Sequence, residues 1–171
     1  MPARTVLDRI KEKFDGTIDR VDIPEESRLF LHVRPSKVKE VCRYVFRDLD
    51  ARYVISIGMD DRPWSGGFLV AHDFAFEKDH VLASIICPVP AEDPRIDCIS
   101  DVVPAANWAE REFRDLVGIE PVGCPNPKRL ILPDGWPEGE HPLRKSREDT
   151  WIPVRGDSRQ VADEDDHFSF P

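Results

Sequence analysis

The sequence of 171 residues lacks several features that would assign it to a common class of protein. No apolar run approaches the roughly 20 residues that span a bilayer, and the first residues lack the apolar segment of a secretory signal. The four cysteines, Cys42, Cys87, Cys98 and Cys124, include no Cys-x-x-Cys pair, the spacing typical of zinc sites and iron–sulfur clusters. Neither of the glycine-rich motifs that cradle phosphates occurs. We therefore expect a cytoplasmic chain with reduced thiols and no cofactor or metal of its own.

Positive charge is also scarce. Lysine and arginine number 24 against 33 aspartates and glutamates, which gives a formal net charge of −9. Nucleic-acid binding depends on clustered cations that neutralise phosphates, so this composition disfavours it. A hydrophobic fraction of 40% suits one soluble domain with a real core.

The spacing of apolar residues predicts the order helix, two strands, helix, three strands, helix. Short links between successive strands favour an α+β fold, an antiparallel or mixed sheet of about five strands with helices packed on it. The predicted elements are a helix capped by Thr5 and ended by Gly16, strands at Thr17–Ile23 and Arg28–Arg34, a helix capped by Ser36 that runs to Asp50, strands at Arg52–Met59, Gly67–Glu77 and His80–Cys87, and a helix around Trp108.

Two patterns within these elements predict which side chains are buried. His72 shares its strand face with Val70 and Phe74, so we expect a structural histidine in the core, and Cys42 and Cys87 are expected in the core as well. Alternation along the first of the three later strands predicts one common face for Tyr53, Ile55, Ile57 and Met59.

Regular structure thins out after residue 120. Seven prolines rule out a long helix there: Pro121, Pro125, Pro127, Pro133, Pro137, Pro142 and Pro153. We therefore divide the chain into an α+β domain of residues 1–120, an extended proline-rich ribbon of residues 121–156 that docks onto a partner, and an acidic, mobile tail of residues 157–171.

The helix around Trp108 has an apolar stripe and a distinctive flank. Helical spacing places Trp108, Arg111 and Asp115 together beside the stripe, and Trp and Arg are enriched in interface hot spots, so we expect this flank to face a partner. The alternative is a solvated helix with i,i+4 ion pairs worth at most ~1 kcal/mol each. The stripe predicted to face the domain's own sheet consists of Ala105, Ala109, Phe113, Leu116 and Val117.

The ribbon combines turn-forming residues, one tryptophan and local positive charge. Arginine suits bidentate pairing with carboxylates of another chain, which favours docking. A catalytic alternative pairs Cys124 with His141 as nucleophile and base. The ribbon residues that carry the docking interpretation are Lys128, Arg129, Gly135, Trp136, Gly139, His141, Arg144, Lys145 and Arg147.

These two segments resemble one known family, the C subunit of respiratory complex I (NADH dehydrogenase) and its counterparts in complex I-related membrane-bound [NiFe] hydrogenases. The helix Ala106–Ile119 is similar to the family motif Ala-x-Trp-x-Glu-Arg-Glu-x-x-Asp-Leu-x-Gly-Ile at every fixed position. Arg129–Leu132 resembles its Arg-x-x-Leu strand, and Gly139–Lys145 resembles Gly-x-x-Pro-Leu-Arg-Lys.

The departures from the family pattern favour its hydrogenase branch. Gly123-Cys124-Pro125 stands where complex I members usually have Gly-His-Pro, and Ser146-Arg147-Glu148 stands where they have Asp-Phe-Pro. The run Trp136-Pro137-Glu138-Gly139 is similar to one found often in hydrogenase members.

The resemblance implies a structural and assembly subunit without a catalytic site, a cofactor or a metal of its own. It implies a peripheral position on the cytoplasmic side of the cell membrane, against a large catalytic subunit and an iron–sulfur small subunit that hold the iron–sulfur clusters and the [NiFe] centre or quinone site. Arg111→Ala or Arg144→Ala is expected to weaken assembly and leave the isolated domain folded. The rival classes are an autonomous Cys/His enzyme and a soluble adaptor. The predicted interface residues are Trp108, Glu110, Arg111, Glu112, Asp115, Arg129, Trp136, Gly139, His141, Arg144 and Lys145.

Overall fold

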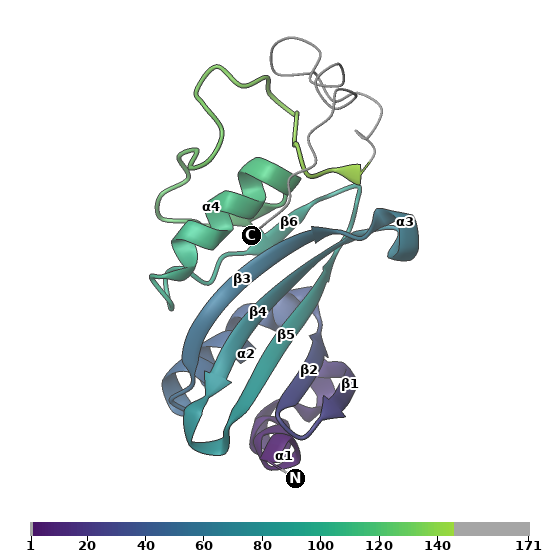
Figure 1. The fold of residues 1–171 in the computed structure, drawn as a ribbon, viewed down its shortest axis with the longest axis vertical. Coiled ribbons are helices and arrows are strands. Elements are labelled where there is room, and N and C mark those ends of the chain that lie inside the picture. The colour runs from purple at the N-terminus through teal and green to yellow at the C-terminus, as the bar shows by residue number, and fades with distance from the viewer. Residues whose placement is uncertain (1, 146–171) are drawn as a thin grey trace, which may run out of the picture.

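A computed structural model of the chain describes residues 2–145. Five strands form one sheet in the order β1-β2-β5-β4-β3, and a second sheet pairs β6 with β7 (Figure 1). The pairing of β2 with β5 is parallel and the other three pairings in the large sheet are antiparallel, so the sheet is mixed. The strands are β1 (Ile18–Glu25), β2 (Arg28–Val33), β3 (Arg52–Asp60), β4 (Phe68–Phe76), β5 (Val81–Val89), β6 (Arg95–Asp97) and β7 (Glu120–Val122).

Helices cover one face of the large sheet. In Figure 1, α2 lies behind the sheet, α1 lies at the lower end near β1, β2 and β5, and α4 lies beside β3 at the upper end. The helical elements are α1 (Pro2–Phe14), η1 (Asp15–Thr17), η2 (Pro35–Lys37), α2 (Val38–Arg43), η3 (Tyr44–Asp48), α3 (Arg62–Ser65), η4 (Glu77–Asp79) and α4 (Ala106–Val117). The predicted α+β class is confirmed, and the predicted helices and strands occur in the expected order, but α3, β6 and β7 were not predicted.

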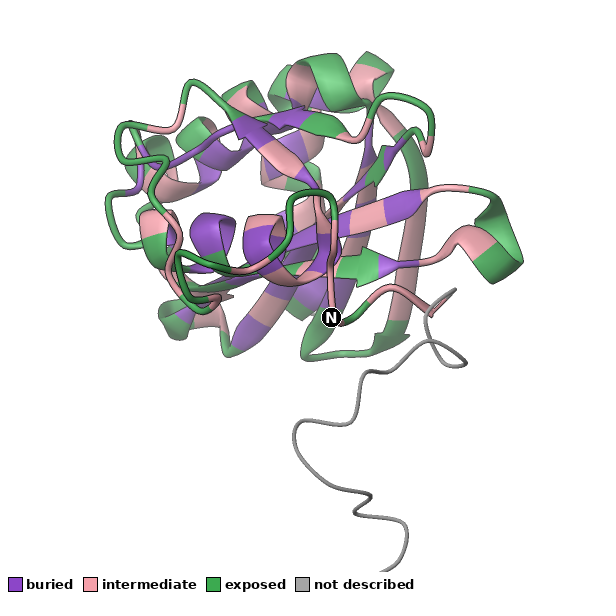
Figure 2. Ribbon diagram, turned by 90° about the horizontal axis from the view of Figure 1, so that it is seen from above, coloured by how far each residue is buried: buried purple, intermediate pink, exposed green. Residues whose placement is uncertain are grey.

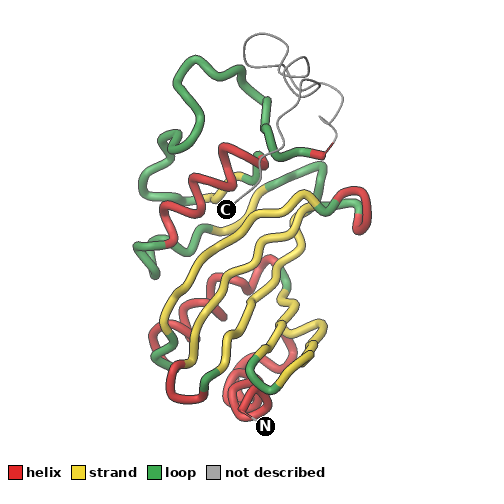
Figure 3. Tube along the Cα trace, in the orientation of Figure 1, coloured by secondary structure: helices red, strands yellow, loops and turns green. Residues whose placement is uncertain are grey.

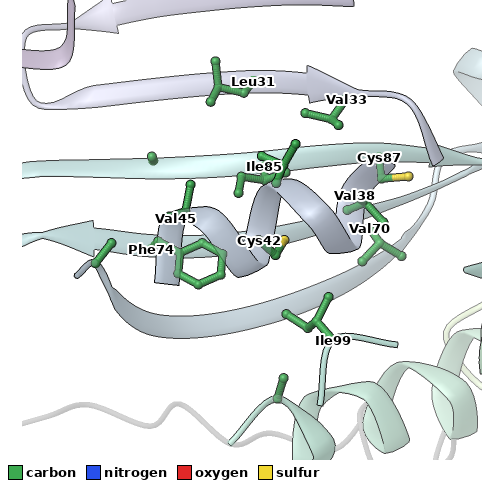
Figure 4. Packing of buried hydrophobic residues seen from close by; sticks show 14 of the residues in the cluster. Leu31, Val33, Val38, Cys42, Val45, Val70, Phe74, Ile85, Cys87 and Ile99 are labelled. Atoms are coloured by element: carbon green, nitrogen blue, oxygen red, sulfur yellow. The ribbon is translucent and has the colours of Figure 1, made fainter. Parts of the chain in front are cut away.

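The hydrophobic core lies between the sheet and α1 and α2, and buried residues gather there in the view from above (Figure 2). Figure 4 shows side chains from β2, β4 and β5 meeting those of α2 and η3. Cys42 and Cys87 are both fully buried within it, as the sequence predicts. The labelled core residues are Leu31, Val33, Val38, Cys42, Val45, Val70, Phe74, Ile85, Cys87 and Ile99.

His72 is buried in this core, as expected. Its Nδ1 lies 2.7 Å from Ser56 Oγ, which in turn lies 2.9 Å from the Tyr53 hydroxyl. Burial lowers the pKa of His72 to about 4. His72 is therefore a neutral structural residue at pH 7.

Both early helices differ from their predicted form. The first helix begins at Pro2 instead of after Thr5, because the buried Ala3 donates its N–H to Glu26 O over 3.0 Å and so fixes the first turn against the β1–β2 turn. The second is not one α-helix capped by Ser36. It opens with η2, which has no side-chain cap, and closes with the π-helical η3, in which Leu49 N donates to Tyr44 O.

The predicted common face of β3 is wrong at its first member. A register shift between Tyr53 and Ile55 separates the two residues. Tyr53 pairs with the buried Phe74, whereas Ile55 pairs with Asp73 on the opposite face. The inserted residue Val54 therefore turns Tyr53 into the core and leaves Ile55, Ile57 and Met59 on the face without helices.

From Gly123 to Pro142 the chain forms no helix or strand and runs over α4 as a loop (Figure 3). The predicted boundary between residues 120 and 121 falls inside β7, so the loop begins two residues later than the predicted ribbon. The rest of the ribbon and the acidic tail lie outside the described residues. Among residues 2–145, no helix combines the length and apolar character needed to cross a membrane.

Candidate docking site

Asp115 organises the first part of the ribbon. Its carboxylate is buried on α4, and one oxygen, Oδ2, accepts the N–H groups of Leu130, Ile131 and Leu132 over 2.8, 2.8 and 3.2 Å. Three successive backbone donors around one carboxylate form a charge-assisted anion nest. Because these N–H groups point at Asp115, they do not serve a sheet ladder. The strand implied by the family resemblance at Arg129–Leu132 is therefore absent, and the segment forms bends.

Arg111 lies one helical turn before Asp115 and holds the preceding carbonyls of the ribbon. Its Nε donates to Lys128 O over 2.7 Å and its Nη2 donates to Arg129 O over 2.9 Å. The guanidinium also lies over the Trp108 ring, 5.5 Å from the centroid. Trp108 itself is 63% exposed, so a buried cation supports an exposed aromatic ring.

The i,i+4 ion pairs of the alternative interpretation do not form along α4, because Arg114 and Glu110 have more distant partners. Arg114 donates through Nε to Glu120 on β7 over 2.7 Å and through Nη1 to Pro127 O. Glu110 is buried, and its Oε1 accepts the N–H of Ile99 over 2.6 Å. Burial raises the pKa of Glu110. Glu110 thus attaches the helix to its own domain, and Arg114 attaches it to both β7 and the ribbon.

The last part of the ribbon completes the carboxyl end of α4. Arg144 Nε donates to Val117 O over 2.8 Å, and Leu143 N donates to Leu116 O over 2.9 Å. His141 Nδ1 lies 2.9 Å from Asp115 O, and it must carry the hydrogen because a carbonyl oxygen only accepts. These donors satisfy carbonyls that a helix end leaves free, and the Arg144 cation suits the negative end of the helix dipole. Burial lowers the pKa of His141, which favours its neutral form.

Gly118 makes this closure possible. It has φ +79°, the left-handed conformation that ends a helix at low cost only in glycine. A Cβ at this position would overlap the side chains of His141 and Arg144. The glycine thus lets the ribbon approach the helix end.

The ribbon's described end is fixed to the large sheet at Asp60. Asp60 Oδ2 accepts the N–H of Lys145 over 2.9 Å, and both carboxylate oxygens accept from Arg62 over 2.8 and 2.7 Å. The Arg62 guanidinium holds the pKa of Asp60 well below its usual range. Lys145 Nζ lies 3.4 Å from the centroid of the exposed Trp64 ring.

Between these anchors the ribbon forms a compact loop. Arg129 Nη1 donates to Pro133 O over 3.0 Å and to Trp136 O over 2.9 Å, and Trp136 Nε1 donates to Glu140 O over 3.0 Å. Gly139 turns the chain with φ +74°. A polar hollow of about 380 Å³ lies between this loop and the end of α4.

The predicted interface residues therefore divide into two groups. Trp108 and Glu112 are exposed. The prediction of an outward flank is wrong for Arg111 and Asp115, which the ribbon covers. Gly139 is exposed, and Arg129, Trp136, His141 and Arg144 are half-buried within the helix–ribbon contact. Glu110 is buried against Ile99, and Lys145 is half-buried beside Asp60 and Trp64.

Some residues that build the site were not singled out in the sequence. Gly118 carried a signal, since a glycine directly after a helical pattern is a typical C-terminal cap. No sequence signal pointed to Asp60, because its partner Lys145 is distant in the chain and follows no periodic pattern.

Cys124 and His141 do not form a pair. Cys124 Sγ contacts Asn107 Nδ2 at 3.1 Å near the start of α4, whereas His141 bonds to Asp115 near its end. The helical rise between residues 107 and 115 is about 12 Å. Among the described residues no group of three or more His, Cys, Asp or Glu could hold a metal ion.

The geometry defines a mixed α+β domain in which one helix, α4, holds an extended ribbon from Arg111 to the carboxyl end of the helix. The family model of the respiratory-chain NADH dehydrogenase, 30 Kd subunit, matches residues 31–150. The chain belongs to this family.

The relatives are subunits of complex I and of complex I-like complexes. Hydrogenase-4 component G of Escherichia coli is 31% identical over 84% of the chain, but this covers only 26% of component G, so the chain spans about a quarter of that protein. The C subunit of the F(420)H(2) dehydrogenase of Methanosarcina mazei is 32% identical over 86% of the chain and 93% of the relative. The membrane-bound hydrogenase subunit beta of Pyrococcus furiosus is 31% identical over 83% and 84%.

Two solved structures share the fold. A chain of the archaeal membrane-bound sulfane sulfur reductase superposes with a TM-score of 0.74 over the full length of both chains at 18% identity. A trypsin-resistant fragment of Nqo5 superposes with a TM-score of 0.61 over 74% of this chain and 99% of the fragment, at 22% identity. Both support the mixed α+β architecture.

Proposed function

We propose that this chain is a non-catalytic structural and assembly subunit in the peripheral arm of a membrane-bound, ion-translocating oxidoreductase complex. One observation carries the proposal. The charged residues of the family motif, Arg111, Asp115 and Arg144, direct their hydrogen bonds to backbone atoms of the ribbon and helix end. Such bonds pre-order an extended surface before a partner arrives, which lowers the entropic cost of association.

The partners proposed are the large catalytic subunit and the iron–sulfur small subunit of the same complex, on the cytoplasmic side of the membrane. Component G supports a large partner, because there a counterpart of this chain is joined to about three times its own length of further protein. Iron–sulfur clusters and a [NiFe] centre or quinone site would lie in these partners, with none in this chain.

Within this class we favour a ferredoxin-linked, energy-converting [NiFe] hydrogenase. The run Trp136-Pro137-Glu138-Gly139 supports this choice, as do relatives named as hydrogenase components. The second candidate is the C subunit of NADH:quinone oxidoreductase, favoured by the description of the matching family itself.

Purification of the tagged full-length chain from membranes of its native host tests the proposal. We expect recovery of several partner subunits with iron in the complex, and nickel with ferredoxin-driven hydrogen evolution for the hydrogenase. NADH-driven quinone reduction without nickel would select the second candidate. A chain that leaves the membrane fraction alone, or that alone binds stoichiometric metal, would reject the structural role.

Trp108→Ala tests the docking surface itself. The ring is largely exposed, so we expect unchanged folding but at least tenfold weaker recovery of partners, as for a hot-spot aromatic. Glu12→Ala, an exposed change on the distant α1, serves as the control. Equal recovery from the two variants would remove Trp108 from the interface.

A further inference from the structure

The large sheet has a second face that no described element covers. Figure 1 shows β3, β4 and β5 in front of α2, with no described part of the chain in front of these strands. Directly paired residues of neighbouring strands share a face. The pairs Ile57–Ala71, Ala71–Ile86 and Ile86–His32 therefore form one row across this open face.

The open face has an apolar half and a polar half. Beyond β5, the strands β2 and β1 present one apolar residue, Phe30, among four polar ones, Arg28, His32, Arg20 and Asp22. The apolar half lies on β3, β4 and β5, and Ile55, Ile57 and Met59 there are 38–40% exposed. Its residues are Ile55, Ile57, Met59, Leu69, Ala71 and Ile86.

The apolar half continues around the edge of the sheet. An apolar groove of about 180 Å³ between β3 and α4 is lined by Ile55 and Ile57 on one side and by Leu116 and the exposed Leu143 on the other. The sheet face, the groove and the end of the ribbon thus form one continuous surface. Contiguous apolar surface of this kind on a soluble chain marks an interaction site.

One carboxylate interrupts the apolar half. Asp73 lies between Ile55 and Ser84 in the row next to Ile57 and Ala71. Its Oδ1 is buried and has no hydrogen-bond partner among the described residues. A partner that covered this face with apolar side chains would bury the Asp73 carboxylate without a counter-charge. Because burying an unpaired charge costs several kcal/mol, such a partner must also supply a cation.

We propose that the open face is a second interface, occupied by a different subunit whose apolar face carries one arginine or lysine that pairs with Asp73. The proposal rests on the proposed function for the existence of such a partner. It assigns that partner a surface apart from Trp108 and predicts the chemistry of the contact. The groove beside Leu143 makes the new surface continuous with the ribbon.

Two other occupants fit the charges less well. A second copy related by a twofold axis through Ala71 would bring two Asp73 carboxylates toward each other without a cation of the apolar half between them. The chain's own residues 146–171 contain seven carboxylates against three arginines, so their net charge has the same sign as Asp73. A different subunit with an apolar face and one cation covers the apolar half and also pairs with Asp73.

A photo-crosslinking amino acid in place of Ile57, introduced in the full-length chain within its native complex, tests the occupant. The expected product joins residue 57 to a peptide of another subunit that contains an arginine or lysine beside apolar residues. A product with residues 146–171, a product with a second copy, or no product from an intact complex would overturn the proposal.

Charge reversal tests the contact at Asp73. Asp73→Lys is expected to lower recovery of that subunit at least tenfold, whereas Asp15→Lys, with the same change in net charge on the exposed η1, leaves it unchanged. Urea unfolding of the purified variants verifies that both fold. If Asp73→Lys does not fold, Ile57→Glu replaces it with the same expected loss.

The two proposals fail in different ways. If the unaltered chain recovers no subunits, the proposed function fails. If it recovers them and Asp73→Lys or Ile57→Glu recovers them equally well, only the open-face interface is wrong.

Discussion

Gly118 shows how one residue can control the approach of two segments. Its positive φ ends α4, and its missing side chain leaves room for His141 and Arg144 to reach the last carbonyls of the helix. Gly66 has nearly the same φ, +80°, at the end of α3, but no atom lies within 4 Å of a Cβ built there. A comparison of substitutions at the two glycines therefore distinguishes the cost of backbone strain from the cost of steric overlap.

Gly118→Ala and Gly66→Ala should destabilise the chain by different amounts. Both incur the strain of a left-handed alanine, about 1–2 kcal/mol. Gly118→Ala adds the displacement of His141 and Arg144, a further cost of about 1–3 kcal/mol. Urea unfolding of both variants measures the difference in the free energy of unfolding. Equal decreases would show that His141 and Arg144 move away from residue 118 at no cost.

At the scale of elements, α4 and the ribbon form one unit. The described ribbon has little regular structure of its own, so its order depends on bonds to the helix, from Arg111 and Asp115 at one end to Arg144 at the other. A helix usually stabilises a domain through its apolar stripe, which here packs on β3 through Phe113. The polar side of α4 stabilises the ribbon through the hydrogen bonds of Arg111 and Asp115.

Asp115→Ala should loosen the ribbon and leave the sheet intact. Loss of the carboxylate leaves three N–H donors without an acceptor, which costs about 3 kcal/mol. Local opening of the ribbon exposes these donors to water and relieves this cost. Hydrogen exchange should accelerate at the amides of residues 130–132, and trypsin should cut faster after Lys128 and Arg129. Glu112→Ala, which removes an exposed carboxylate from the same helix, is the control. Unchanged exchange in Asp115→Ala would mean that the ribbon holds its form without α4.

At the scale of the whole molecule, the buried His72 couples stability to pH. In the folded chain its pKa is about 4, compared with 6.5 for an unperturbed histidine. Between these values the unfolded chain binds more protons than the folded chain, so stability falls as the pH falls. The lowered pKa of His141 acts in the same direction, and the raised pKa of Glu110 acts in the opposite one.

His72→Asn should flatten this dependence. The unaltered chain is expected to lose roughly 3 kcal/mol through His72 between pH 7 and pH 4, at up to about 1.4 kcal/mol per pH unit. The difference between the two proteins in urea unfolding at several pH values cancels the contributions of His141 and Glu110. Parallel curves would show that folding leaves the pKa of His72 unchanged.

The limits of the sequence are clearest where two segments meet. Apolar periodicity identified the α4 stripe except at its first member, where the predicted Ala105 is exposed and Ala106 is buried instead. Alternation identified the core face of β4, because both patterns reflect burial against the sheet. The helical pattern also placed Arg111 and Asp115 on one flank, but it could not indicate what covers that flank. The ribbon covers that flank. Its sequence has no hydrophobic periodicity, and its contacts with Arg111 and Asp115 are made by backbone atoms, which leave no pattern in the sequence. The bulge at Val54 was equally hidden, since one inserted residue leaves the alternation of residues 55, 57 and 59 intact.

The parallel pairing of β2 with β5 bears on how the chain is made. Arg28 pairs with Leu82, more than fifty residues later, and β3, β4 and the helices α2 and α3 are synthesised between the two residues. During translation β2 has no neighbouring strand on its β5 side until β5 has left the ribosome, and closing so long a loop is slow. Throughout that interval Leu29 and Leu31 lie open to solvent. The nascent chain is therefore expected to need a chaperone just before β5 emerges.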